Sequence, residues 1–260
     1  MPKNLYILKI GGRVIDEPDH LNRILNSFAE IPNPKIMVHG GGNTASELST
    51  KLGIVPKMVE GRRITDEATL EVVTMVYGGL VNKQLVAQLQ SKGVNAIGLS
   101  GADANIIPAR KRAVKEIDFG FAGDLKDSAP ANQSLELFLA HGLVPVCCPL
   151  THDGKGQRLN TNADTIASHL GITLSQKFQV TLVYCLDKPG VLTDAHDHSS
   201  VIKNLNPASY QQLVSEGVIN QGMIPKLDNA FSGLRLGIDE IFLCNWQDIS
   251  GSSGTKVSLS

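Results

Sequence analysis

The chain has 260 residues and a formal net charge of −1, and only 5% of its residues are aromatic. This composition provides neither a basic surface nor a base-stacking surface, so we expect no nucleic acid partner. No apolar run approaches the length of a membrane span, and no basic-then-apolar leader is present, so we expect a cytoplasmic location and no membrane partner.

Short apolar runs alternate with longer amphipathic stretches along the chain. The apolar runs, which we expect to form strands, are 5–10, 35–39, 94–99, 143–148, 180–185 and 239–244. The amphipathic stretches, which we expect to form helices, are 17–30, 43–52, 66–92, 132–141, 162–170, 207–216 and 223–236. This alternation predicts an α/β fold with one mainly parallel sheet.

Two further segments have weaker patterns. Residues 106–125 alternate in polarity and contain two glycines, which favours hairpins that project from the sheet. The end of the chain, 255–259, fits a final strand and a frayed terminus equally well. The softest boundary lies between Leu174 and Phe178, and it divides the chain into two lobes on one continuous sheet.

Two glycine-rich turns directly follow the first two predicted strands. Lys9 stands just before Gly11 and Gly12, and the second turn reads His39-Gly40-Gly41-Gly42. Ligands bind beyond the carboxyl ends of parallel strands, glycine lets backbone N–H groups approach an anion, and lysine adds a point charge. The pattern predicts a phosphate site, although glycine would serve a tight strand-to-helix turn equally well.

Generic nucleotide and metal signatures are missing. Neither turn matches G-x-x-x-x-G-K-[ST] or G-x-G-x-x-G, which argues against a P-loop enzyme or a nicotinamide-dependent dehydrogenase. The four cysteines form no C-x-x-C pair and lie in apolar contexts, so we expect buried small hydrophobic side chains. His196 and His198 lie in a polar loop without a partner cluster. We therefore expect no metal site built by protein side chains.

Seven short motifs occur in an order that resembles the amino acid kinase family, and its acylglutamate kinases in particular. They are Lys9-Ile10-Gly11-Gly12, His39-Gly40-Gly41-Gly42, Gly61-Arg62-Arg63-Ile64-Thr65-Asp66, Gly78-Gly79-Leu80-Val81-Asn82-Lys83, Leu159-Asn160-Thr161-Asn162-Ala163-Asp164, Asp187-Lys188-Pro189-Gly190-Val191-Leu192 and Gly222-Met223-Ile224-Pro225-Lys226. The resemblance implies a three-layer αβα sandwich around one mainly parallel open sheet with two lobes. It assigns acyl amino acid binding and dimerisation to 1–176, and ATP binding to 177–260.

The resemblance also implies an activity. Such enzymes transfer the γ-phosphoryl group of ATP to the side-chain carboxylate of an N-acylated glutamate, a step of arginine biosynthesis. A carboxylate is already ionised at neutral pH, so the reaction needs no general base but does need positioning and positive charge. Mg²⁺ is expected to arrive with ATP. The acyl group, acetyl or succinyl, stays open at this point.

Two alternatives remain at the level of the sequence. The chain is either another kinase of the family, similar to a carbamate kinase or a glutamate 5-kinase, or a non-catalytic homologue that binds a metabolite. A non-catalytic homologue is expected to lose Lys9, Lys226 or Asp164, and all three residues are present.

The resemblance assigns individual roles. It implies that Lys9 and Lys226 stabilise the transferred phosphoryl group and that Asp164 organises them, although a plain helix-capping role for Asp164 is a serious alternative. Gly11 and Gly12 correspond to the phosphate site, and the substrate set is Gly41, Gly42, Arg63 and Asn160, with Arg62 as a competitor for the role of Arg63. The nucleotide set is Asp187, Gly190, Val191, Leu192, Val218, Ile219, Asn220 and Met223.

The expected assembly is a homodimer. Family members that are inhibited by arginine carry an extra helix before the first strand, and that helix joins dimers into a hexamer. Only Met1 to Asn4 precede the first predicted strand here, so we expect a dimer insensitive to arginine, formed through the long stretch 66–92.

Overall fold

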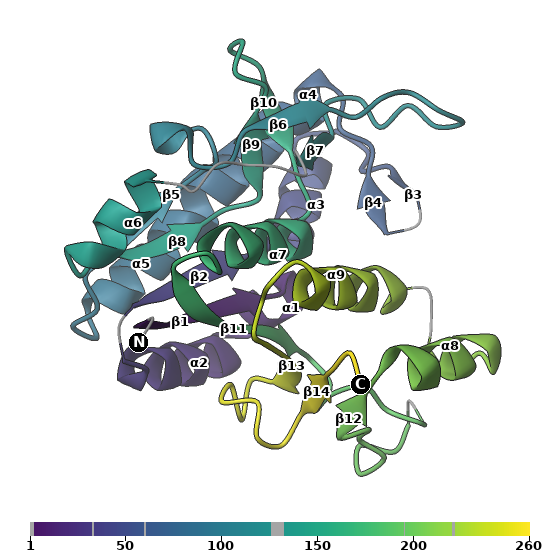
Figure 1. Cartoon of the computed structure of the whole chain (residues 1–260). Coiled ribbons are helices and arrows are strands. Elements are labelled where there is room, and N and C mark those ends of the chain that lie inside the picture. Colours follow the sequence, from purple (N-terminus) through teal and green to yellow (C-terminus); the bar gives the residue numbers. More distant parts are fainter. Residues whose placement is uncertain (1–2, 33, 60, 126–132, 195, 220–221) are drawn as a thin grey trace.

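The computed structural model describes residues 3–32, 34–59, 61–125, 133–194, 196–219 and 222–260. Its main sheet contains β1 (Lys3–Ile10), β2 (Lys35–His39), β5 (Ala96–Leu99), β8 (Val144–Cys147), β11 (Phe178–Leu186), β12 (Asn204–Leu205), β13 (Glu240–Asn245) and β14 (Thr255–Val257). The strand order is β12–β14–β13–β11–β1–β2–β8–β5, and neighbours are parallel except for β13 and β14 (Figure 1). The predicted mainly parallel sheet is confirmed, and of the two alternatives for the end of the chain the strand is formed, as β14.

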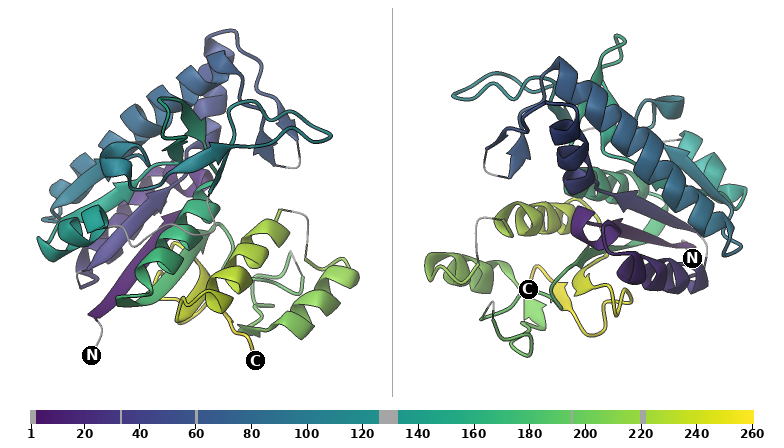
Figure 2. Two further views of the ribbon diagram at one scale, coloured as in Figure 1. Left: turned by 45° about the horizontal axis from the view of Figure 1, so that its top comes forward. Right: turned by 180° about the vertical axis from the view of Figure 1, so that it is seen from behind.

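Helices cover both faces of this sheet. They are α1 (Gly12–Ile15), α2 (Pro18–Glu30), α3 (Gly42–Lys51), α4 (Glu67–Val73), α5 (Asn82–Gln90), α6 (Gln133–Ala140), α7 (Ala163–Leu174), α8 (Pro207–Ser215) and α9 (Ile224–Arg235). Helices α6, α7 and α9 lie on one face, and α2, α4 and α5 lie on the other (Figure 2). A separate buried apolar cluster fills each interface, which gives the expected three layers.

Side-chain alternation along the strands decides which face each polar residue meets. In β1, Leu5 and Ile7 pack into the cluster beneath α7 and α9, whereas Leu8 and Ile10 pack into the opposite cluster. Lys9 shares the parity of Leu5 and Ile7, so it is directed to the α7 side.

The long stretch predicted as one helix over 66–92 is divided into three helical pieces. Asp66 caps α4 by accepting a hydrogen bond from Thr69 N at 2.9 Å. A π-helical segment, η1 (Thr74–Val81), then connects α4 to α5. The wider π turns begin at β-branched Thr74 and include Gly78 and Gly79, and such insertions are frequent at functional sites.

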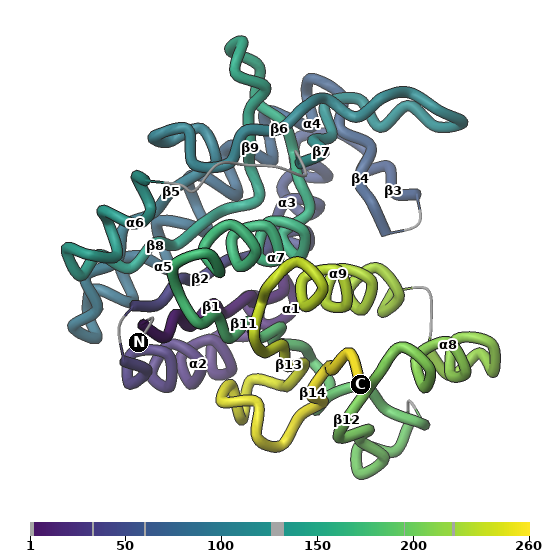
Figure 3. The backbone as a smooth tube through the Cα atoms, viewed as in Figure 1, coloured from purple at the N-terminus to yellow at the C-terminus, as the bar shows by residue number. Residues whose placement is uncertain are grey.

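Three small antiparallel pairs lie outside the main sheet. They are β3 (Met58–Val59) with β4 (Arg62–Arg63), β6 (Ala109–Lys111) with β7 (Gly123–Leu125), and β9 (Leu150–His152) with β10 (Arg158–Asn160). Strands β6 and β7 confirm the hairpin expected within 106–125. The β3–β4 pair and the loop between β6 and β7 extend from the same end of the molecule (Figure 3).

Candidate active site

Three charged side chains from three separate elements meet beside the end of β1. Lys9 Nζ lies 2.7 Å from Asp164 Oδ1, and Lys226 Nζ forms an ion pair with Asp164 Oδ2. The side chains of Lys9 and Asp164 are each only 8% exposed, and that of Lys226 is 23% exposed. The structure therefore brings together all three predicted catalytic residues, and the single carboxylate separates the two ammonium groups.

The local sequence explains how α7 and α9 present these groups. Asn162 caps α7, because its side-chain oxygen accepts hydrogen bonds from Asp164 N at 2.7 Å and Thr165 N at 3.2 Å. Asn162 thus performs the capping that Asp164 would otherwise provide, and the Asp164 carboxylate is left to the lysines. Pro225 occupies the first turn of α9, and Lys226 follows it.

Burial and charge act in opposite directions on this cluster. Burial alone would raise the pKa of the Asp164 carboxyl, but Lys9 and Lys226 outweigh it and lower that pKa to about 2. Burial lowers the pKa of Lys9, with Lys226 adding to the effect, while Asp164 opposes it. Asp164 is thus the main group that opposes the lowering of the Lys9 pKa.

The two glycine turns face each other backbone to backbone. A Cβ atom on Gly12 would lie 3.3 Å from Gly42 N and 3.6 Å from Gly41 N, and one on Gly40 would lie 3.2 Å from Gly12 N. Gly41 has a φ of +150°, which side-chain-bearing residues rarely adopt. We call these two turns, residues 11–12 and 40–42, the glycine cradle. Its backbone N–H groups and the N-terminus of α3 form an environment that suits an anion.

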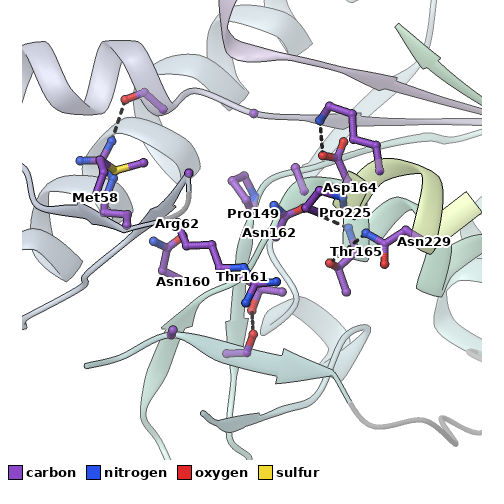
Figure 4. Close-up of a pocket in the computed structure, with 18 of the residues that line it drawn as sticks. Met58, Arg62, Pro149, Asn160, Thr161, Asn162, Asp164, Thr165, Pro225 and Asn229 are labelled. Carbon is purple, nitrogen blue, oxygen red and sulfur yellow. Dashed lines mark hydrogen bonds and ion pairs between the residues drawn. The ribbon is translucent and has the colours of Figure 1, made fainter. Parts of the chain in front are cut away.

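A cavity of about 640 Å³ opens next to the cradle. It is lined by Gly40–Gly42, Met58, Gly61–Arg63, Tyr77, Arg112, Ala122, Gly123, Pro149, Asn160–Thr165, Gly222, Ile224–Lys226, Asp228 and Asn229. Met58 and Arg62 lie on one side of it, and Asp164, Pro225 and Asn229 lie on the other (Figure 4). The cavity thus joins the charged cluster to the β3–β4 pair.

The predicted substrate residues all line this cavity. Arg63 is 8% exposed, and its Nη2 donates hydrogen bonds to Gly42 O at 2.9 Å and Ser46 Oγ at 2.7 Å. Its Nη1 is buried and forms no hydrogen bond with any described residue. Asn160 Nδ2 donates to Thr65 Oγ1 at 3.0 Å. Arg62 belongs to the lining but is exposed, so Arg63 is the arginine that is fixed in place.

Most of the described nucleotide residues lie around β11, β14 and α8, outside the lining of this cavity, whereas Met223 stands between Gly222 and Ile224, which both line it. A Cβ on Gly190 would lie 2.6 Å from Thr255 Oγ1, the same oxygen that accepts a hydrogen bond from Val191 N. Val191, Leu192 and Ile219 are buried, Val218 N donates to Leu213 O, and Met223 is the N-cap residue of α9. Asp187 pairs with Arg13 at 2.9 Å at the surface. Asn220 lies outside the described residues.

Other chemistry is not apparent in the described part of the chain. Residues 147, 148, 185 and 244 are buried cysteines without disulfides. No three His, Cys, Asp or Glu side chains of the described residues gather so that they could hold a metal ion. None of the described helices has the length and apolar character needed to cross a membrane.

Comparison with known proteins gives the chain its family. The family model described as "Amino acid kinase family" matches residues 4–245. The chain belongs to the amino acid kinase family. The acetylglutamate kinase of Cytophaga hutchinsonii is 53% identical over 248 residues, which are 95% of this chain and 93% of that protein. The acetylglutamate kinase of Bacteroides fragilis is 51% identical over 258 residues, 99% of this chain and 98% of that one.

A solved structure supports the fold of this amino acid kinase family member. The N-acetylglutamate synthase of Neisseria gonorrhoeae, complexed with coenzyme A and N-acetyl-glutamate, superposes with a TM-score of 0.83 at 19% identity. The alignment covers 100% of this chain and 60% of that one. At this identity the likeness concerns the fold alone.

Sequence reasoning missed several residues around the site. Tyr77 and Arg112 line the cavity, Ser46 holds Arg63, and Asn162 caps α7. Arg112 also binds Asp124 through Nε at 2.9 Å and Nη2 at 2.7 Å. The N-x-N-A-D motif carried a signal for Asn162, since asparagine directly before a helix is a typical cap. No local pattern marked Tyr77 or Arg112, which reach the cavity only through tertiary structure.

Proposed function

We propose that the chain is an ATP-dependent kinase that phosphorylates the side-chain carboxylate of an N-acylated glutamate to the acyl phosphate, in arginine biosynthesis. Its relatives at about half identity over nearly their whole length carry the name acetylglutamate kinase. The observation that carries the proposal is the Lys9–Asp164–Lys226 cluster beside the glycine cradle. A buried and a half-buried lysine next to an anion-binding turn suit phosphoryl transfer better than binding alone.

The reaction needs no proton movement. One oxygen of the ionised substrate carboxylate attacks the γ-phosphorus of ATP, the bond from phosphorus to the bridging oxygen breaks, and ADP leaves with that electron pair. Negative charge is spread over the transferred phosphoryl group and the leaving oxygen during this step. Lys9 and Lys226 stabilise this charge, Asp164 lies between them and pairs with both, and the N–H groups of Gly11, Gly12, Gly41 and Gly42 add hydrogen bonds.

Arg63 is suited to hold the amino acid end of the acceptor. Its Nη2 is engaged by Gly42 and Ser46, which fixes the plane of the guanidinium group. Tyr77 also interacts with this guanidinium group. The fixed positive charge of Arg63 on the cavity wall suits a carboxylate of the acceptor. Asn160, held by Thr65, provides a further polar contact in the same cavity.

The nucleotide is assigned to the second lobe. We divide the chain at 176/177, with acyl amino acid binding and dimerisation in 1–176 and ATP binding in 177–260. The loop of Asp187, Gly190, Val191 and Leu192 and the segment of Val218, Ile219, Asn220 and Met223 contact the nucleoside, largely through backbone groups. Mg²⁺ neutralises charge on the phosphates of ATP and is held mainly by their oxygens and water.

We further propose a cytoplasmic homodimer. The π segment η1 carries Met75 and Leu80 on the surface, 52% and 56% exposed. Two large apolar side chains exposed on one long helical stretch provide a self-complementary contact of the kind that closed dimers use.

A panel of acceptors tests the function. The purified protein, ATP and Mg²⁺ are incubated with N-acetylglutamate, N-succinylglutamate, free glutamate, aspartate or carbamate, and ADP and acyl phosphate are measured. We expect transfer to an N-acylglutamate and little transfer to free glutamate. Both acyl groups are included because Arg62, Arg112 and Met58 line the cavity and would treat a charged and a neutral acyl group differently. Preference for free glutamate or carbamate would overturn the proposal.

A further inference from the structure

A buried chain of hydrogen bonds lies behind the second turn of the glycine cradle. His39, the last residue of β2, is 0% exposed. Its Nδ1 lies 2.6 Å from Gly40 O, and its Nε2 lies 3.1 Å from Asn82 Nδ2. A carbonyl oxygen can only accept, so Nδ1 carries the proton and Nε2 accepts from the Asn82 amide. The chain of donors therefore runs from Asn82 through His39 to Gly40.

Asn82 is held in a single orientation. Its Nδ2 also donates to Val146 O at 2.9 Å, and its Oδ1 accepts from Lys83 Nζ at 3.0 Å. A Cβ atom on Gly98 would lie only 1.9 Å from Asn82 Oδ1, so glycine at this position of β5 leaves the space for that side chain. The Gly78–Lys83 motif thus contributes a fixed polar group that connects α5 to β2, β5 and β8.

The π segment packs on the same turn from the apolar side. A Cβ on Gly41 would lie 3.0 Å from Tyr77 Cδ1 and 3.5 Å from Val81 Cγ2. Gly40 is therefore held through its carbonyl and Gly41 through close contact with η1. Three successive glycines have unusually large backbone freedom, so such a turn keeps one conformation only if its surroundings impose it.

We propose that His39 and Asn82 are positioning residues that aim the N–H of Gly41 into the glycine cradle for phosphoryl transfer. In a trans peptide the carbonyl of Gly40 and the N–H of Gly41 point in opposite directions. Fixing the carbonyl on His39 therefore directs the N–H to the other side, where Gly12 lies. This inference rests on the proposed function, because that function gives the N–H its role.

The protonation state of His39 suits this task. Burial lowers the pKa of His39 to about 4, Lys83 lowers it further, and the hydrogen bond to Gly40 opposes the shift. The imidazole is therefore neutral near pH 7 and keeps the tautomer that donates to Gly40.

Four variants test the proposal. His39→Phe keeps a ring of similar volume and removes both nitrogens, and His39→Asn restores a donor close to the position of Nδ1. Asn82→Leu breaks the chain at its other end. Lys35→Met is the matched control: Lys35 is the first residue of the same strand, is 3% exposed and donates to three backbone carbonyls remote from the cradle.

Transfer kinetics provide the first readout, with each rate expressed per folded molecule from urea unfolding curves. We expect His39→Phe and Asn82→Leu to lower kcat roughly 10²-fold while the KM of the acyl substrate changes less than about threefold. His39→Asn should have a kcat about tenfold higher than that of His39→Phe. Lys35→Met should lower the free energy of unfolding without lowering kcat. A kcat for His39→Phe equal to that of the wild type, or a loss as large in Lys35→Met, would overturn the proposal.

Amide hydrogen exchange provides a second readout that needs no substrate. Peptides covering residues 40–43 should exchange faster in His39→Phe and Asn82→Leu than in the wild type and in Lys35→Met. Unchanged exchange in these peptides would refute the proposal that His39 and Asn82 hold the turn, even if the kinetics changed. If the wild type transfers phosphate to no acyl amino acid, the proposed function fails, and the exchange data still decide whether His39 and Asn82 hold the turn.

Discussion

Replacing Asp164 with asparagine removes one charge from the centre of the cluster and keeps the shape of the side chain. In the wild type, Asp164 forms ion pairs with Lys9 and Lys226. It is also the main group that opposes the lowering of the Lys9 pKa. In the variant, burial and Lys226 both act to lower that pKa without this opposition. Lys9 should therefore lose its proton more readily, and the two lysines should separate.

The structure sets the expected size of the effect. Each lysine contributes as a donor to developing charge, and loss of one such donor costs about 10²–10³ in kcat, so Asp164→Asn should fall in that range. The free energy of unfolding should also depend on the charge of Asp164. The pKa of Asp164 is about 2 in the folded protein and 3.8 for an unperturbed aspartate, and this difference corresponds to about 2 kcal/mol of unfolding free energy. Because the folded value is the lower one, this contribution is present above pH 3.8 and is lost as pH falls towards 2.

Two assays follow from this reasoning. The kcat of Asp164→Asn should fall with rising pH earlier than that of the wild type, because the variant lacks the carboxylate that opposes the lowering of the Lys9 pKa. Urea unfolding between about pH 4 and about pH 2 should show the acid-dependent loss in the wild type and a smaller loss in the variant. A variant with wild-type kcat and an unaltered pH profile would refute the idea that Asp164 organises the two lysines.

Three further predictions concern the two lysines, Arg63 and His39. Lys9→Ala and Lys226→Ala should each lower kcat about 10²–10³-fold and change the KM of the acyl substrate far less. A change confined to KM would indicate instead that the lysine binds the ground state and the transition state equally well. Arg63→Lys should raise that KM with a smaller effect on kcat, since lysine cannot hold a carboxylate in two-point geometry while bound to Gly42 and Ser46; an unchanged KM would exclude Arg63 from the substrate site. Wild-type stability should also fall between pH 6.5 and about pH 4, because burial lowers the folded pKa of His39 to about 4 and the unfolded chain binds the proton more readily. His39→Asn should lose this part of the pH dependence in denaturant titrations, and its retention would show that another group is responsible.

Much of the fold was predictable because it depends on local pattern. The six apolar runs expected as strands correspond to β1, β2, β5, β8, β11 and β13, and the amphipathic stretches located most helices. The prediction of one helix over 66–92 was only partly right. Apolar periodicity does not distinguish α from π winding, and the π segment depends on how Tyr77 and Val81 pack against Gly41.

Short elements were missed for a different reason. Strands β3, β4, β9, β10 and β12 have two or three residues each, too few for any alternation to appear in the sequence. They are determined by pairing partners and by the loops around the cavity, which are tertiary features.

The site residues also divide into those marked by sequence motifs and those that depend on tertiary structure. Lys9, Asp164 and Lys226 were found through motif order, and the structure brings them together across 217 residues of sequence (226 minus 9). His39 and Asn82 belong to two of the same motifs, but motif order did not indicate that they contact each other. Only the fold places the end of β2 against the start of α5.

Isotope transfer from the acceptor tests the central claim most directly. N-acetylglutamate and N-succinylglutamate labelled with ¹⁸O in the side-chain carboxylate are incubated with the protein, ATP and Mg²⁺, and the acyl phosphate is trapped with hydroxylamine. Hydroxylamine attacks the carbonyl carbon, so the released phosphate keeps the bridging oxygen. We predict that this phosphate carries one ¹⁸O from the labelled carboxylate of at least one of the two substrates. Unlabelled phosphate, or ADP formation without a hydroxamate, would contradict attack by the side-chain carboxylate on the γ-phosphoryl group.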